Sequence, residues 1–180
     1  MRTNYWRLQT LFEDDIVFST IALREDGVKF DIGLAVTDKD IVATYSVMRQ
    51  LRPNVKKSDY LKMVRLQEKE IQFRLARLKV RGRVECAAGF RLCRSLGWGR
   101  YLYVDDLVTD KNCRSKGVGK MMFSWLVEYA RQQGCDELRL DSAVYRHEAH
   151  RFYLRERMDI NCFNFSLDLR ARRQGRISSN

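Results

Sequence analysis

Residues 101–130 read YLYVDDLVTDKNCRSKGVGKMMFSWLVEYA, a strand-like segment followed by a glycine-rich turn and an amphipathic helical pattern. The turn, RSKGVG at residues 114–119, leads directly into the helix. The first backbone N–H groups of a helix have no intrahelical partner and carry the positive end of the helix dipole. Because Gly117 and Gly119 have no Cβ, a phosphate can approach this backbone closely. The stretch therefore predicts an anion-binding site suited to a pyrophosphate.

Two better-known phosphate loops do not fit this turn. The Walker pattern needs a glycine five residues before the Gly-Lys pair and a Ser or Thr after it, but these positions hold Arg114 and Met121. The dinucleotide fingerprint, started at Gly117, needs a third glycine where Met122 stands. The pattern that remains is Arg-x-x-Gly-x-Gly after the strand-like residues 107–110, LVTD.

This pattern resembles the acyl-CoA-binding motif of the GNAT family of N-acetyltransferases. Further along the chain, Ala149, Phe152 and Tyr153 are similar to the second motif of that family, Ala-x-x-Phe-Tyr. The resemblance covers residues 28–169 and implies acetyl-CoA as acyl donor, with no metal. It also implies that the pantetheine arm pairs with the backbone of one strand, and that this strand and the next splay apart. The cofactor-binding residues that it implies are Leu107, Val108, Thr109, Arg114, Ser115, Lys116, Gly117, Val118, Gly119, Lys120 and, on the adenine side, His150.

Acetyl transfer to an amine needs an uncharged nucleophile and a proton for the departing thiolate. Asp105 and Asp106 lie where relatives in the GNAT family often carry a carboxylate pair, and neighbours in a strand face opposite sides. We therefore expect only one of them to face the amine, and the sequence does not decide which. The resemblance implies that Tyr153 protonates the thiolate.

The periodicity along the chain predicts an α+β layered fold, with a mixed, mostly antiparallel sheet flanked by helices. A first strand at 28–35 is followed by a helix with a Thr37–Asp40 capping box, which Pro53 ends, and by a helix capped by Ser58. From Ile71 the period changes to two. The remaining expected elements are strands at 71–75, 84–92 and 101–109, the helix after the turn with Gly134 at its end, a strand at 138–140, a helix at 147–158 and a last strand at 163–169.

The chain of 180 residues is expected to form one domain, 1–180, with an N-terminal extension at 1–26 and a frayed basic tail at 170–180. The extension is too apolar for a disordered arm, so we expect an added helix or hairpin that packs on the core or on a second subunit of a homodimer. No apolar run approaches the roughly 18 residues of a membrane span, which favours a cytoplasmic protein without membrane contact.

The five scattered cysteines argue against a disulfide framework and against zinc. Cys135 and Cys162 are expected in the core, and Cys113, beside the turn, is the one thiol that could be reactive. The net charge is +11, but the sequence lacks the motifs that would make this charge diagnostic of nucleic-acid binding. The same charge can equally steer a polyanionic cofactor to the protein.

The sequence therefore predicts an acetyl-CoA-dependent N-acetyltransferase that acetylates a primary amine, with a small-molecule acceptor favoured. Two alternatives stay open. One is a non-catalytic acyl-CoA-binding regulator, and the other, less favoured, is a basic nucleic-acid-binding module.

Overall fold

The computed structural model describes residues 7–11, 19–23 and 28–169. The chain divides into two units, Met1–Leu140 and Asp141–Asn180, and each is described by itself. The predicted basic tail at 170–180 lies outside the described residues, as do residues 1–6, 12–18 and 24–26 of the predicted extension. The prediction of a single domain over 1–180 stays a prediction.

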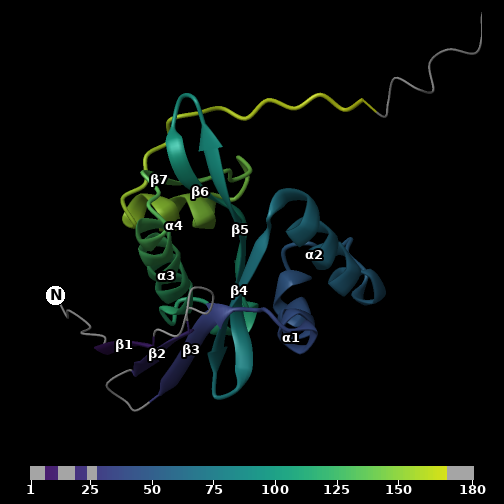
Figure 1. Cartoon of the computed structure of the whole chain (residues 1–180), viewed down its shortest axis with the longest axis vertical. Coiled ribbons are helices and arrows are strands. Elements are labelled where there is room, and N and C mark those ends of the chain that lie inside the picture. Colours follow the sequence, from purple (N-terminus) through teal and green to yellow (C-terminus); the bar gives the residue numbers. More distant parts are fainter. Residues whose placement is uncertain (1–6, 12–18, 24–27, 170–180) are drawn as a thin grey trace, which may run out of the picture. The chain divides into compact units, whose positions relative to one another are not determined.

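The first unit is built on a seven-stranded sheet whose strands lie side by side in chain order (Figure 1). Every neighbouring pair is antiparallel except the last, in which β6 and β7 are parallel. The sheet is therefore mixed and mostly antiparallel, as the sequence predicts. The strands are β1 Arg7–Leu11, β2 Ser19–Leu23, β3 Lys29–Leu34, β4 Arg74–Val80, β5 Arg83–Ser95, β6 Gly99–Thr109 and β7 Glu137–Leu140.

Two of these strands belong to the predicted N-terminal extension. β1 pairs with β2, and β2 continues the sheet by pairing with β3 along its whole length, from Ser19 opposite Gly33 to Leu23 opposite Lys29. Of the two forms left open by the sequence, a helix and a pair of strands, the structure has the strands. They pack at the edge of the sheet of the same chain.

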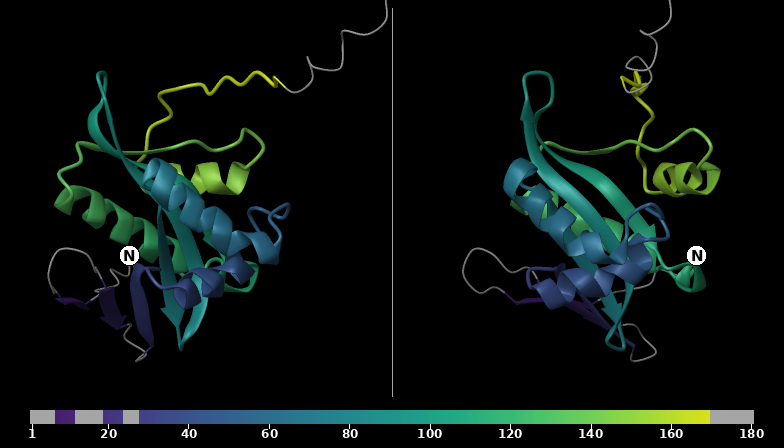
Figure 2. Two further views of the ribbon diagram at one scale, coloured as in Figure 1. Left: turned by 45° about the vertical axis from the view of Figure 1, so that its right-hand side comes forward. Right: turned by 90° about the vertical axis from the view of Figure 1, so that its right-hand side faces the viewer.

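Helices cover both faces of the sheet (Figures 1 and 2). The helices α1 Asp38–Met48 and α2 Lys57–Ile71 share one apolar cluster with the sheet, and α3 Val118–Gln132 shares another. Val108 of β6 belongs to the α1–α2 cluster, whereas Val104 belongs to the α3 cluster. The first unit is thus a three-layer arrangement in which β6 contributes to both cores.

Of the three predictions made for the ends of α1 and α2, one is confirmed and two are wrong. Thr37 caps α1, because its hydroxyl accepts a hydrogen bond from the Asp40 N–H at 3.1 Å. Ser58, by contrast, does not cap α2; the cap position is Lys56, and the Ser58 hydroxyl donates to Asp59 inside the first turn. Ile71 is the last residue of the helix and not the first of a strand, because Gln72 adopts a left-handed conformation that ends the helix.

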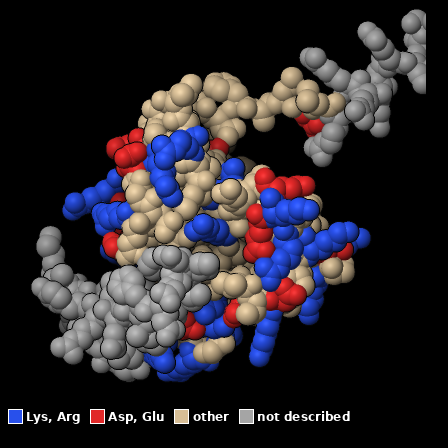
Figure 3. Space-filling model, viewed as in Figure 1, with Lys and Arg blue, Asp and Glu red and all other residues tan. Residues whose placement is uncertain are grey.

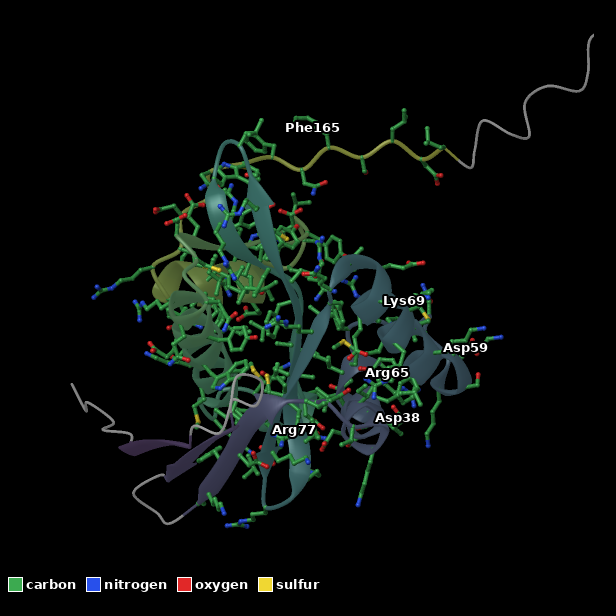
Figure 4. The ribbon with its side chains drawn as sticks, in the orientation of Figure 1. Asp38, Asp59, Arg65, Lys69, Arg77 and Phe165 are labelled. Atoms are coloured by element: carbon green, nitrogen blue, oxygen red, sulfur yellow. The ribbon has the colours of Figure 1, made fainter. Side chains whose placement is uncertain are left out.

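An ion pair ties the two helices of this layer together. On α2, Arg65 binds the Asp38 carboxylate at the start of α1 at 2.5 Å, and its guanidinium also donates to the Val36 carbonyl (Figure 4). This ion pair fixes α1 and α2 relative to each other, and with them the two ends of their connection, residues 49–56.

The second unit contains α4 His147–Arg155, which is shorter than the predicted helix at 147–158. The prediction of a last strand at 163–169 is wrong. The alternation of apolar and polar residues is present, but no described strand pairs with this segment, and a strand needs a paired partner. Its apolar side chains are exposed, with Phe165 at 91% (Figure 4).

Within the described ranges, no helix has both the length and the apolar character that a bilayer span requires.

Candidate functional site

The glycine-rich turn predicted as an anion site lies between β6 and α3. Ser115 and Gly117 both have positive φ angles, 60° and 82°, and no side chain caps the N-terminus of α3. A Cβ added to Gly117 would meet no atom within 4 Å, so the space in front of the helix is open. Successive N–H groups in such a turn form a concave surface that binds anions, and the helix dipole adds to it. The turn therefore fits a phosphate group.

Gly119 serves packing as well. A Cβ at this position would lie 3.0 Å from the hydroxyl oxygen of Thr109 at the end of β6. The Thr109 hydroxyl in turn donates a hydrogen bond to the thiol of Cys86 on β5, at 3.5 Å. The absence of a side chain at Gly119 thus lets the first turn of α3 lie close against the strand.

The side chains of the turn are mostly exposed, but one is anchored. Lys116 donates a hydrogen bond from Nζ to the Asn112 carbonyl at 3.0 Å, across the short 3-10 helix Lys111–Cys113 that precedes the turn. Arg114 is exposed. Cys113 is only 3% exposed, burial raises the pKa of its thiol, and it contacts Arg83. The suggestion that Cys113 is a reactive thiol is therefore wrong, because a reactive cysteine needs exposure and a lowered pKa.

The edge of β6 leading to this turn is unpaired on one side. β7 pairs with β6 only from Tyr101 to Val104, whereas β5 pairs with β6 as far as Thr109. Within the described residues, the backbone of residues 105–109 therefore has no strand on the β7 side. An extended ligand can add to such an edge as a further strand. The splay of adjacent strands implied by the resemblance stays a prediction, because β7 is paired along its whole length and ends at Leu140.

A β-bulge in β6 separates the two predicted carboxylates. Gly89 of β5 pairs with Asp106 and the next residue, Phe90, pairs with Val104, which leaves Asp105 as the extra residue. A bulge changes which face the following side chains occupy. In agreement, Val104 packs in the α3 cluster, whereas Val108 packs in the α1–α2 cluster.

Asp105 is held by an arginine of the neighbouring strand. Arg91 of β5 donates two hydrogen bonds to the Asp105 carboxylate, from Nε to Oδ2 at 2.8 Å and from Nη2 to Oδ1 at 2.7 Å. The same guanidinium lies 5.1 Å from the ring centroid of Tyr103. Both oxygens of Asp105 thus already have a charged partner, and the hydrogen bonds that Arg91 donates to Asp105 raise the pKa of Arg91.

Asp106 has a different environment. Its side chain is 14% exposed, and Arg52, from the connection between α1 and α2, donates from Nε to its Oδ1 at 2.7 Å. Its other oxygen, Oδ2, accepts no hydrogen bond from the described residues and faces Gly89, whose added Cβ would lie 3.1 Å away. Burial raises the pKa of Asp106, the charge of Asp105 adds to this rise, and Arg52 opposes it. Asp106 is a mostly buried carboxylate with one oxygen to offer.

The α1–α2 connection is fixed against β6 and against the short 3-10 helix that follows it. Arg52 also donates from Nη2 to the Asp105 carbonyl at 3.2 Å, and Gln50 accepts a hydrogen bond from the Lys111 N–H at 3.0 Å. Beneath it, the hydroxyls of Tyr60 and Thr44 lie 2.7 Å apart, and burial raises the pKa of Tyr60 to about 12. Tyr60 therefore stays neutral and serves as a fixed polar support.

The sequence alone did not point to Arg52, Arg91 or Tyr60. Each belongs to an element other than β6, and only the folded chain brings it to the carboxylates. The one signal in the sequence was the arginine just before Pro53, at the end of a predicted helix.

The second unit holds the remaining predicted residues. Tyr153 and Phe152 are neighbours on α4, with ring centroids 5.4 Å apart, and Tyr153 is half-buried. His150, on the same helix, lies with Nε2 3.0 Å from the Ala143 carbonyl oxygen. This contact fixes the imidazole within its own unit.

Among the described residues, no three His, Cys, Asp or Glu side chains gather in an arrangement that could hold a metal ion. Lys and Arg are mixed with Asp and Glu over α1 and α2 on the face seen in Figure 3, so the positive charge forms no continuous stripe there.

Comparison with known proteins gives the family of the chain. The sequence pattern of the acetyltransferase (GNAT) family matches residues 38–158. An uncharacterized N-acetyltransferase, YhdJ of Bacillus subtilis, is 32% identical over 110 residues, which cover 61% of this chain and 78% of that protein. An aminoalkylphosphonate N-acetyltransferase of Salmonella typhimurium is 35% identical over 63 residues, 35% of this chain and 41% of that protein.

The fold is shared with solved acetyltransferase structures. The crystal structure of an acetyltransferase from Trypanosoma brucei superposes with a TM-score of 0.64 at 19% identity, covering 78% of this chain and 99% of the other. The residues that match the family pattern, 38–158, span Asp106, the unpaired edge of β6 and the glycine-rich turn. The chain therefore belongs to the GNAT family of acetyltransferases, and it is an N-acetyltransferase.

Proposed function

We propose that the protein transfers an acetyl group from acetyl-CoA directly to the primary amine of a small molecule. The observation that carries this proposal is the continuity of β6: one strand links a mostly buried carboxylate, Asp106, through an unpaired backbone edge to the open glycine turn. The proposed amine site thus lies on the strand that leads to the proposed phosphate site. The name of the relative from Salmonella typhimurium, which refers to aminoalkylphosphonates, supports a small-molecule acceptor.

When bound, acetyl-CoA supplies an activated acetyl thioester. The residues proposed to hold its phosphates are those of the turn, 114–120, chiefly through backbone N–H groups, because Gly117 leaves the N-terminus of α3 open. Residues 107–109 are proposed to hydrogen-bond the pantetheine arm through their unpaired edge. His150 is proposed as a contact on the adenine side.

Asp106 is the group that we assign to the amine. Its Oδ2 has no partner among the described residues and can accept a hydrogen bond from the amine, while Arg52 holds Oδ1 in place. Burial raises the pKa of Asp106, which makes its carboxylate a stronger base than that of an exposed aspartate. Asp105, with both oxygens bound to Arg91, is assigned to holding the bulge.

Tyr153 is proposed as the proton donor to the departing thiolate, on the strength of its position in the Ala-x-x-Phe-Tyr motif of α4. A phenol is neutral at physiological pH and can act as such a donor.

The test is an acceptor screen. The purified chain is incubated with acetyl-CoA and a panel of small primary amines, thiol release is followed with time, and the products are identified by mass spectrometry. The proposal expects amine-dependent thiol release with an N-acetylated product. Binding of CoA without release for any amine would favour the non-catalytic regulator instead.

A further inference from the structure

Arg52 has N–H donors that are not used in its hydrogen bonds to β6. Its Nε binds Asp106 and its Nη2 binds the Asp105 carbonyl, so one edge of the guanidinium is anchored to β6. A guanidinium has five N–H donors in a fixed plane. The two on Nη1 and the second on Nη2 have no partner among the described residues, and the side chain is 52% exposed.

The anchored edge holds the exposed guanidinium of Arg52 in a fixed position. A surface arginine usually loses rotamer freedom when it binds an anion, and this entropy cost weakens the contact. Arg52 has already lost that freedom through Asp106 and Asp105, and the bond between Gln50 and the Lys111 N–H fixes the backbone of the same connection. The free edge of Arg52 is therefore preorganised for an anion.

The free edge belongs to a guanidinium that lies next to the proposed amine-binding carboxylate. Because Arg52 Nε is 2.7 Å from Asp106 Oδ1, the positive and negative groups are neighbours. One molecule can bind both only if its amine and its anion are separated by a few bonds. An acceptor with a second cation in place of the anion would meet Arg52 as a like charge, which disfavours diamines.

We infer that the acceptor is a zwitterion, a small primary amine that carries a carboxylate or phosphate group close to the amine, with the anion bound by the free edge of Arg52. This inference rests on the proposed function, because it takes Asp106 as the amine-binding group. Arg52 thus sets specificity: it selects acceptors by the anion they carry.

Arg49 offers a matched control. It lies on the same connection, is exposed and carries the same charge, but its guanidinium lies 6.0 Å from the Tyr45 ring centroid, and no described contact joins it to Asp105 or Asp106. Replacing Arg49 removes one positive charge from the region without removing the anchored edge.

The experiment measures kcat/KM by thiol release for two matched pairs of amines and for one diamine. β-Alanine is compared with its amide, and phosphoethanolamine with ethanolamine; 1,3-diaminopropane is the diamine. The full-length wild type, Arg52→Gln, Arg52→Lys and Arg49→Gln are assayed. The ratio within each pair is the readout, because any effect of Arg52 on Asp106 or on folding acts on both members and cancels.

In wild type, at least one anionic amine should exceed its neutral partner by about tenfold or more, the size expected for a hydrogen bond to a charged group. Arg52→Gln should bring that ratio close to one, Arg52→Lys should retain part of it, and Arg49→Gln should leave it unchanged. The diamine should be the poorest acceptor.

Three results would overturn the inference. If wild type turns over the neutral amines and the ratio of kcat/KM within each pair is near one, the acceptor need not be a zwitterion, and the proposed function stays intact. If the preference for the anionic amine survives in Arg52→Gln, or is also lost in Arg49→Gln, the preference would come from the general positive charge of the region and not from Arg52. No thiol release with any of the five amines would count against the proposed function and this inference together.

Discussion

Replacing Gly117 by Asp and, separately, by Asn distinguishes the anion-binding role of the turn from its role in folding. Gly117 has a φ of 82°, and a Cβ there would meet no atom within 4 Å. Asn and Asp adopt left-handed conformations more readily than other non-glycine residues. Both variants should therefore bear a similar backbone cost of about 1 kcal/mol. Only Asp adds a negative charge in front of α3.

The charge should affect binding and stability in opposite directions. A carboxylate about 4 Å from a phosphate repels it by about 1 kcal/mol in bulk water and by about 4 kcal/mol at the effective dielectric constant near a protein surface. The Kd for acetyl-CoA should thus rise, relative to Gly117→Asn, by about fivefold to about 1000-fold. Without ligand, the same carboxylate faces the positive end of the α3 dipole and should stabilise the fold by about 0.3–1 kcal/mol.

Isothermal titration calorimetry gives the Kd of the two variants and of wild type, and thermal denaturation without ligand gives their stabilities. The expected pattern is weaker binding by Gly117→Asp than by Gly117→Asn, with equal or higher stability. Equal Kd values for the Asp and Asn variants would refute the placement of a phosphate at this turn.

Three further outcomes follow from the structure. Gly89→Ala should lower the Tm in thermal denaturation by the equivalent of about 1–3 kcal/mol, because the added Cβ would clash with the Phe73 ring; an unchanged Tm would mean that β4 and β5 adjust freely. Asp106→Asn should not lower the Tm at neutral pH. Burial raises the pKa of Asp106 in the folded protein, so ionisation of this group costs the wild type stability as the pH rises through that pKa. Any gain in Tm of Asp106→Asn over wild type at neutral pH should therefore fade at acidic pH. The opposite trend would contradict the assigned burial. Tyr153→Phe should lower kcat by about 100-fold or more, as loss of a general acid does, with the Kd for acetyl-CoA unchanged; wild-type kcat would remove the proton-donor assignment.

The elements that the sequence predicted best were those with strong local signals. Thr37 at the start of α1 and Gly134, with a φ of 65°, just beyond α3 are end signals that act within a few residues. The turn before α3 was likewise predictable, because the positive φ of Gly117 is a conformation that glycine adopts without steric cost.

Other elements depended on partners distant in the sequence. Residues 163–169 alternate like a strand, yet the described residues provide no strand to pair with them. Ile71 fitted the strand pattern equally well but belongs to α2, whose end is set by the left-handed conformation of Gln72. Alternation describes a side-chain pattern and does not supply the pairing.

The difference between Asp105 and Asp106 shows the same limit within the candidate site. Strand alternation predicted that the two side chains would differ, but the structure separates them by a bulge opposite Gly89 and by two arginines, Arg91 and Arg52. Neither the bulge nor either arginine could be inferred from residues 101–130, because each depends on the register with β5 or on the α1–α2 connection.

The central claim is that Asp106 receives the amine on the strand that leads to the glycine turn. The most direct measurement compares kcat/KM for the amine in Asp106→Asn and Asp105→Asn at saturating acetyl-CoA, by thiol release. We expect Asp106→Asn to lose about 100-fold or more, the contribution of a positioned base, and Asp105→Asn to keep most of the wild-type activity. Wild-type activity in Asp106→Asn, or an equal or larger loss in Asp105→Asn, would contradict the account.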